Sequence, residues 1–275
     1  MRLIYQKDHA RRVRFDETGV RGTTEAHLDP ELTGRFRTSR TSDSDSTLAR
    51  KLGMTATGES GGTRLTVAGV LMGTKRPDRW LPQAFVQAVA YRGDSISASM
   101  EHRNYQLDAR DIRGPLDSQV AGACRFVAQN QRIAGRKTLG REDIPQYDMT
   151  AVFEAVVNAI AHRDYLVSAS KIRLRMFRNR LELYSPGALA NTITLDSLAY
   201  RQATRNEAVT SLLAKCRIPE SIPGLRTTRR TLMDRRGEGV PVILERSERL
   251  SGRRPVYRLI DGAELQLTIH AASAD

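Results

Sequence analysis

The feature that most constrains this chain is an amphipathic stretch that ends at Tyr165. Apolar residues recur at helical spacing and predict one buried face: Val152, Ala155, Val156, Ala159 and Ile160. Glu154, Asn158 and His162 follow at intervals of four residues, so on a helix they form one polar ridge. The ridge lies beside the apolar stripe, so an acid, an amide and an imidazole are held at the edge of a buried surface.

Two interpretations of this ridge are open from spacing alone. In the first, Glu154 is a general base toward water, and the amide oxygen of Asn158 is a ligand for a hard cation such as Mg²⁺. In the second, the stretch is an ordinary polar surface helix with a His-Arg-Asp C-terminal cap. His162 taken alone is more typical of a hydrogen-bonded structural histidine than of a ligand.

The wider pattern resembles a known bacterial family. Glu154, Asn158 and His162-Arg163-Asp164-Tyr165 match the motif E-x-x-x-N-x-x-x-H-R-D-Y of the RecG-like, Schlafen/AlbA-associated proteins, which are ATP-binding proteins or transcriptional regulators. Their C-terminal half is similar to the GHKL (histidine kinase-like) ATPase domain of gyrase, MutL, Hsp90 and histidine kinases. The resemblance covers most of the chain, with support from Ser185-Pro186-Gly187, Arg205-Asn206 and Gly237-Glu238-Gly239-Val240.

The resemblance implies an α/β fold in several segments. We expect a GHKL-like ATP-binding α/β sandwich, with helices on a mixed, mainly antiparallel sheet, over residues 145–270. A smaller α+β domain over 65–144 precedes it, residues 1–64 form a partly flexible N-terminal segment, and 271–275 form a frayed tail. The chain begins too late for the family's AlbA-like domain and shows no winged-helix domain, so a fragment of a longer gene is one reading.

The resemblance also implies the site. Glu154 is the expected catalytic residue that positions water, and Asn158 the expected Mg²⁺ ligand, with ATP and Mg²⁺ as cofactors. His162 and Arg163 either orient the phosphates or support the helix. The full nucleotide-binding set that it implies is Asn158, His162, Arg163, Ser185, Gly187, Arg205, Asn206, Gly237 and Gly239.

Ser185 departs from the family pattern. GHKL proteins usually carry Asp-x-Gly here, and the aspartate reads the adenine amino group. A serine hydroxyl can accept that hydrogen bond, but without charge and from a shorter arm. Residues 190–205 resemble the ATP lid, and Gly237 and Gly239 let backbone N–H groups face a phosphate at a helix N-terminus.

Periodicity predicts the other elements. Alternating residues predict strands over 84–91 and 96–100, and hairpins from 171–177 with 180–184 and from 256–260 with 264–269 around Asp261-Gly262. Helices are predicted over 116–130, from the N-cap Asn206 to Cys216, over 229–236 and over 241–250. Residues 38–47 are polar and predict a loop. The apolar run 65–72 fits either type, with Thr66 a candidate cap.

A superficial P-loop at Gly69 to Lys75 is excluded. Lys75 does not directly follow the second glycine, and the spacing is one residue short. A Walker-type NTPase is therefore not the expectation. Helicase motor motifs are also absent from the sequence, so the family label does not imply unwinding of DNA.

Composition narrows the classes further. No apolar run approaches the ~20 residues that span a bilayer, and the start is charged too early for a secretory signal. Cys124 and Cys216 lie far apart, which excludes a disulfide framework or zinc finger and predicts a cytoplasmic protein. The formal net charge is +13, carried mostly by arginine. A basic surface for nucleic acid and a bias in codon composition explain this charge equally well.

Two functions follow. The first is an Mg-ATP-binding, nucleotide-gated regulator with slow or no hydrolysis, at most a weak ATPase. The alternative is a nucleic-acid-binding transcriptional regulator in which the GHKL fold is a scaffold that does not hydrolyse ATP. Since GHKL domains often dimerise on nucleotide binding, the resemblance also implies a homodimer.

Overall fold

The computed structural model of this protein describes residues 14–58, 61–96, 105–137, 141–190, 193–219, 222–234 and 237–273. The helices are α2 (Pro30–Gly34), α3 (Asp45–Lys51), α4 (Val67–Gly73), α5 (Leu116–Asn130), α6 (Met149–His162), α7 (Glu207–Leu213) and α8 (Gly239–Ser251), with the 3-10 turns η1 (Phe15–Glu17), η2 (Glu25–His27) and η3 (Pro77–Arg79). The strands are β1 (Thr55–Thr57), β2 (Thr63–Leu65), β3 (Val86–Tyr91), β4 (Gln106–Ile112), β5 (Ile133–Lys137), β6 (Arg141–Pro145), β7 (Ile172–Met176), β8 (Arg180–Pro186), β9 (Val256–Ile260) and β10 (Glu264–His270). Within these ranges, no helix has the length and apolar character that crossing a membrane requires.

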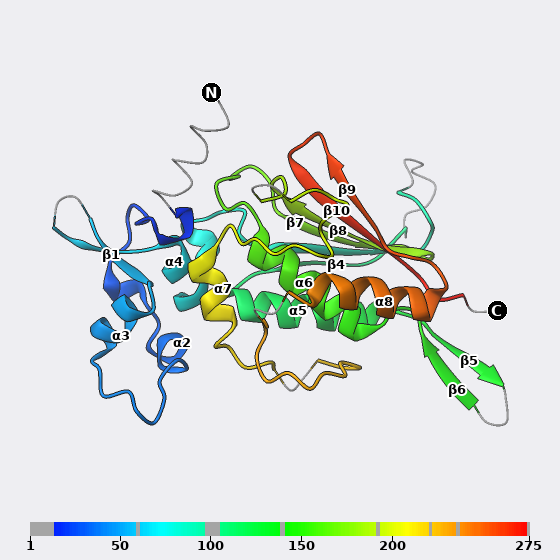
Figure 1. Ribbon diagram of the computed structural model, residues 1–275, viewed down its shortest axis with the longest axis horizontal. Coiled ribbons are helices and arrows are strands. Elements are labelled where there is room, and N and C mark those ends of the chain that lie inside the picture. Colours follow the sequence, from blue (N-terminus) through cyan, green and yellow to red (C-terminus); the bar gives the residue numbers. More distant parts are fainter. Residues whose placement is uncertain are drawn as a thin grey trace.

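The main sheet contains six of the described strands in the order β4-β3-β7-β8-β10-β9. β3 and β7 are parallel, and the other neighbours are antiparallel. Helices α5, α6 and α8 lie across one face of this sheet (Figure 1). The predicted α/β sandwich with a mixed, mainly antiparallel sheet is therefore confirmed.

Alternation along the strands decides which face the helices cover. In β7, Ile172, Leu174 and Met176 are buried, while Arg173 and Arg175 are half-buried on the opposite face. Helix α6 packs against β8 and contacts both α5 and α8. Its residues are consequently almost all buried, including Glu154 of the polar ridge.

The core does not stop at Pro145. Strands β3 and β4 precede this residue, yet they share a sheet with β7 to β10, and α5 packs on α6. One cluster of buried apolar side chains runs from Phe36 to Ile269. The division of the chain at residue 145 stays a prediction, and it would cut through this sheet.

Most predicted elements are confirmed. Helix α5 occupies 116–130, α8 covers the predicted 241–250, and both predicted hairpins form. Asp261 and Gly262 have φ values of 49° and 66°, as expected of an Asp-Gly turn. The apolar run 65–72 ends β2 and forms α4, where Thr66 Oγ1 accepts a hydrogen bond from Gly69 N at 2.9 Å.

Two local predictions were wrong, and a third falls largely outside the described residues. Residues 97–100 of the strand predicted beside β3 lie outside the described residues, and the described neighbours of β3 are β7 and β4, whose charged sequence hides its strand character. Residues 229–234 form no helix, and 235–236 are not described. The polar run 38–47 is a loop only as far as Ser44, which caps α3 through a hydrogen bond from Thr47 N.

Gly69 lets α4 pack closely against the backbone of Met54, and it does not form part of a phosphate-binding loop. A side chain at this position would overlap the carbonyl group of Met54. The glycine is therefore explained by close packing, in agreement with the exclusion of a P-loop.

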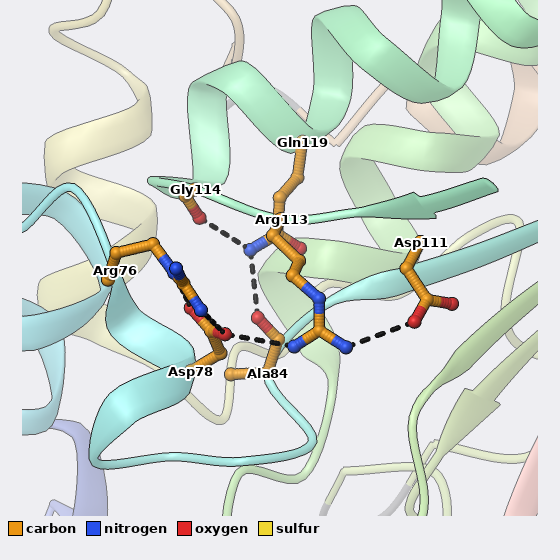
Figure 2. Close-up of polar contacts among 7 residues, drawn as sticks. All are labelled: Arg76, Asp78, Ala84, Asp111, Arg113, Gly114 and Gln119. Atoms are coloured by element: carbon orange, nitrogen blue, oxygen red, sulfur yellow. Dashed lines mark hydrogen bonds and ion pairs between the residues drawn. The ribbon is translucent and has the colours of Figure 1, made fainter.

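A cluster of charged side chains joins η3 to the edge of the sheet (Figure 2). Asp78 accepts from Arg76 Nε at 2.9 Å and from Arg113 Nη1 at 2.9 Å. Arg113 also contacts Asp111 at 3.0 Å and lies over the Phe85 ring at 4.2 Å. Behind this cluster, the buried Gln119 side chain of α5 donates to the carbonyls of Ala84 and Gly114, so that the helix is tied to the loop before β3 and to the turn after β4.

Replacing Asp78 with asparagine is expected to destabilise the fold by about 1–2 kcal/mol at pH 7. Its two arginines hold the pKa of Asp78 at about 2, below the ordinary 3.8. Because the folded-state pKa is lowered, this stabilisation is present above pH 3.8 and is lost as the pH falls toward 2.

Urea unfolding of wild type and Asp78→Asn at pH 7 and at pH 3 measures this difference. The more exposed Asp111, changed to asparagine, is the matched control and should cost less than about 0.5 kcal/mol. A difference for Asp78→Asn that is as large at pH 3 as at pH 7 would contradict the ionic origin of the effect.

Candidate functional site

A cavity of about 370 Å³ opens beside α6, with β8, β9 and β10 on one side and the start of α8 on another. Its floor is apolar, with Leu183, Leu267 and Tyr257. The polar ridge of α6 faces it. The structure brings together these predicted site residues around the cavity: Glu154, Asn158, His162, Ser185, Gly187, Gly237 and Gly239.

Glu154 is paired with a residue that sequence reasoning missed. Its Oε1 accepts a hydrogen bond from Arg229 Nη2, and both side chains line the cavity. Glu154 is 5% exposed, and burial raises its pKa although the Arg229 guanidinium opposes the rise. Arg229 also lies over the Phe153 ring at 5.5 Å. The carboxyl group is thus a buried acid held by one cation.

The start of α8 approaches the ridge closely. A Cβ atom on Gly239 would lie 2.9 Å from Asn158 Nδ2 and 3.2 Å from Glu154 Oε2. Glu238, at the N-cap position, makes no side-chain cap hydrogen bond. The Glu238 side chain therefore does not occupy the N–H groups of the first turn, and the helix dipole favours an anion there.

Ser185 presents an acceptor to the cavity. Its Oγ donates to the carbonyl oxygen of Ala159 at 2.9 Å. Because a hydroxyl has a single hydrogen, only its lone pairs are left for a ligand. Ser185 is suited to a donor such as an amino group, and it stands on the same cavity wall as Leu183.

His162 lines the cavity as a neutral ring. Burial, with a smaller contribution from Arg205, lowers the pKa of His162 to about 4. The imidazole is consequently uncharged at neutral pH. It can offer one donor or one acceptor to a ligand, but no positive charge to a phosphate.

Arg163 and Asn206 lie outside the set of cavity-lining residues. The Arg163 guanidinium donates to the carbonyls of Val167 and Ser170 at 3.0 and 2.7 Å. The Asn206 amide donates to the carbonyls of Ala161 and Arg163 at 2.9 and 2.8 Å. Both side chains satisfy backbone groups at and after the C-terminus of α6, which is an architectural task.

Arg205 links the turn after α6 to the end of β8. It pairs with Asp164 and donates to the carbonyl of Ala188 at 2.6 Å. Gly187 has a φ of 115°, and a Cβ atom there would lie 2.6 Å from Asp164 Cβ. The glycine lets the strand end pass close to the turn after α6, and Arg205 locks the two together beside the cavity.

The N-terminus of α7 is capped by a residue that is distant in the sequence. Asn206 occupies the N-cap position as predicted, but its side chain makes no cap hydrogen bond. Instead the fully buried Asp16 accepts from Val209 N at 3.1 Å. Arg14 adds an ion pair to Glu207 at 2.7 Å. The N-terminal segment therefore holds the helix that follows the predicted lid.

The described part of the predicted lid, 193–205, forms turns without a helix or strand. Ile193, Leu198 and Gln202 from this segment line the cavity. A side chain on Gly237, whose φ is 76°, would overlap the Gln202 amide. The lid segment and the glycine turn before α8 thus meet over the cavity.

The described residues offer little to a free metal ion. Among them, no group of three or more His, Cys, Asp and Glu side chains could hold one. Asn158 supplies one oxygen inside the cavity. Mg²⁺ commonly keeps several waters and takes further oxygens from a bound phosphate. The residues therefore fit Mg²⁺ only together with a ligand that brings phosphate oxygens.

Comparison with known proteins finds likeness in part of the sequence and in the fold. Residues 169–269 match a family described as "Putative ATP-dependent DNA helicase recG C-terminal". The fold is similar to the crystal structure of the DIP2311 protein from Corynebacterium diphtheriae, with a TM-score of 0.65 and 19% identity over 98% of this chain and 50% of that one. The chain thus spans half the length of that protein, and at this identity the likeness concerns the fold alone. None of the curated proteins matches the chain in sequence.

Proposed function

Because residues 169–269 match the model of the RecG C-terminal family of histidine kinase-like ATPase domains, we propose that this protein binds Mg·ATP in the cavity beside α6 and uses it as a regulatory switch. One observation carries the proposal: Glu154, Asn158 and the uncapped start of α8 at Gly239 meet at one wall of a single cavity. A base, an oxygen ligand and an anion site are the parts that phosphate chemistry needs.

The two ends of the cavity suit the two ends of the nucleotide. The apolar floor of Leu183 and Leu267 suits a purine ring, and the Ser185 hydroxyl accepts from its amino group. The phosphates extend toward Gly237 and Gly239, where N–H groups and the helix dipole favour negative charge. Asn158 would hold Mg²⁺ together with phosphate oxygens, and the bound ion would supply positive charge against the phosphates.

Hydrolysis, where it occurs, uses Glu154. The carboxylate takes a proton from water while the water oxygen bonds to the terminal phosphorus, and the bond from that phosphorus to the bridging oxygen breaks to release ADP and phosphate. Glu154 is engaged by Arg229, so the base is partly occupied. Turnover is expected to be slow, which suits a switch better than a motor.

The gating part of the proposal rests on α7. This helix follows the lid segment directly and contacts α4 and, in the N-terminal segment, η1. The contacts of Asp16 and Arg14 with α7 described above add polar links. A lid that closes on nucleotide pulls on α7 and thereby on the N-terminal segment.

Calorimetric titration with Mg²⁺ and a non-hydrolysable ATP analogue tests the proposal, with Gly239→Ala as the blocking variant. We expect saturable binding by the wild type and an affinity about 10–100-fold lower in the variant, because the new methyl group displaces Asn158 and Glu154. Alanine favours a helix start, so the fold is retained.

The matched control is Gly34→Ala, since a Cβ atom at Gly34 meets nothing within 4 Å. It should bind like the wild type. A folded wild-type protein that shows no saturable binding, or a Gly239→Ala variant that binds normally, would count against the nucleotide site.

A second candidate function is nucleic-acid binding by the sheet face that α5, α6 and α8 leave uncovered. On this face Arg173 and Arg175 lie over the Tyr184 ring at 4.3 and 5.3 Å, and β9 adds the exposed Arg258. The arginine side chains on this face suit a phosphate backbone, while the Tyr184 ring beneath them is buried. Fluorescence anisotropy with single-stranded DNA tests this function. The affinity for DNA should fall steeply with salt and should be weaker in Arg175→Ala. If Glu154→Gln leaves that affinity unchanged, the result favours a scaffold role for the ATPase fold.

A further inference from the structure

We propose that Arg229 is the residue that distinguishes a nucleoside triphosphate from a diphosphate, by exchanging its pairing with Glu154 for the terminal phosphate. The inference rests on the proposed function and adds a specificity residue to it. Neither the motif around α6 nor the glycine turn before α8 includes this arginine. It is carried by the contacts of Arg229 in the cavity.

The Arg229 guanidinium lies on one side of the Glu154 carboxyl group, and the start of α8 lies on the other. Glu154 uses Oε1 for Arg229, while its Oε2 lies beside the backbone of Gly239 at the start of α8. The carboxyl group therefore sits between the cation and the helix N-terminus that suits a phosphate. A terminal phosphate placed at that N-terminus would adjoin the carboxyl group that Arg229 holds.

The Arg229 side chain has room to change partners. The Arg229 side chain is 21% exposed and comes from 222–234, which forms no helix or strand element within its described residues. It lines the main cavity and also a second, more open cavity of about 470 Å³, together with Thr227 and Arg230. The guanidinium can therefore turn between Glu154 and a new partner without moving an element of the fold.

A terminal phosphate and the Glu154 carboxylate compete for the charge of Arg229. A phosphate offers three oxygens and more negative charge than a carboxylate, so it competes well for one guanidinium. Asp234 and Glu238 repel the Glu154 carboxylate and favour its protonation. Once Arg229 moves away, Glu154 becomes a better proton acceptor. One exchange thus couples recognition of the terminal phosphate to release of the base.

The experiment compares calorimetric affinities for ADP and for a non-hydrolysable ATP analogue, both with Mg²⁺. Arg229→Ala should lower the affinity for the analogue about 10–100-fold and leave that for ADP within about threefold. Glu154→Gln removes the competing charge and should raise affinity for the analogue about tenfold. In the double variant this gain should vanish, because there is no guanidinium left to release.

The control is Arg230→Ala, the neighbouring exposed arginine, which lines the second cavity but not the first. It should leave both affinities unchanged. Arg229→Lys, which keeps the charge without the planar fork, should recover part of the preference for the analogue. Circular dichroism checks that each variant is folded, and if Arg229→Ala does not fold, Arg229→Lys and the gain in Glu154→Gln carry the test.

The outcomes separate the two proposals. A wild-type protein that binds neither nucleotide contradicts the proposed function. Binding of both nucleotides with an analogue-to-ADP ratio that Arg229→Ala and Glu154→Gln leave unchanged overturns the role of Arg229 alone. A loss of affinity for ADP as large as that for the analogue would mean that Arg229 supports the cavity in general and does not read the terminal phosphate.

Discussion

Replacing Glu154 with glutamine is expected to lower ATP turnover by about 10²–10⁴-fold while nucleotide binding is retained or strengthened. Glutamine preserves the shape of the side chain but cannot take a proton from water. Because burial raises the pKa of Glu154, the wild-type rate should rise with pH through that raised pKa and then level off. Below it the carboxyl group is protonated and the base is lost.

Phosphate release under single-turnover conditions, measured across a range of pH, checks this expectation. The control is Glu245→Gln on α8, whose side chain is 70% exposed and pairs only with its helix neighbour Arg249 among the described residues. It should hydrolyse like the wild type. An unchanged rate in Glu154→Gln would remove Glu154 from the catalytic role.

Changing Asn158 to alanine is expected to remove the Mg²⁺-dependent part of ATP binding, with an affinity loss of at least about 100-fold. Asn158 is the predicted ion ligand and lines the cavity where the start of α8 meets Glu154. In EDTA, where only direct contacts to the nucleotide count, the variant and the wild type should differ by less than about threefold.

Titrations with and without Mg²⁺ separate the two contributions. Asn158→Asp keeps an oxygen at the same place and should recover part of the Mg²⁺-dependent affinity, which a purely structural loss would not allow. Equal losses in Mg²⁺ and in EDTA would show that Asn158 shapes the cavity and does not hold the ion.

The part of the site that sequence alone predicted is the part with a local pattern. A spacing of four residues placed Glu154, Asn158 and His162 on one ridge, and the ridge faces the cavity. The Gly-x-Gly turn was placed correctly at the start of a helix because glycine and helix boundaries are also local features.

What the sequence could not predict comes from contacts between distant residues. Arg229 meets Glu154 across 75 positions, and nothing in its neighbourhood distinguishes it from the many other arginines. The same holds for Asn206, which reads as an N-cap but donates to α6 across 45 and 43 positions. Motif matching grouped Arg163, Arg205 and Asn206 with the ligand-binding residues, whereas in the structure they hold the end of α6 and the start of α7.

The cap that Asp16 provides for α7 has a consequence for the order in which the chain folds. The two partners are 193 residues apart, so during synthesis the N-terminal segment emerges long before its partner helix. Until then the Asp16 carboxyl group stays in water and the surface of α4 that contacts α7 is uncovered. The N-terminal segment therefore completes its packing only after the ribosome has delivered α7, and the lid segment that precedes this helix is put in place in the same late step.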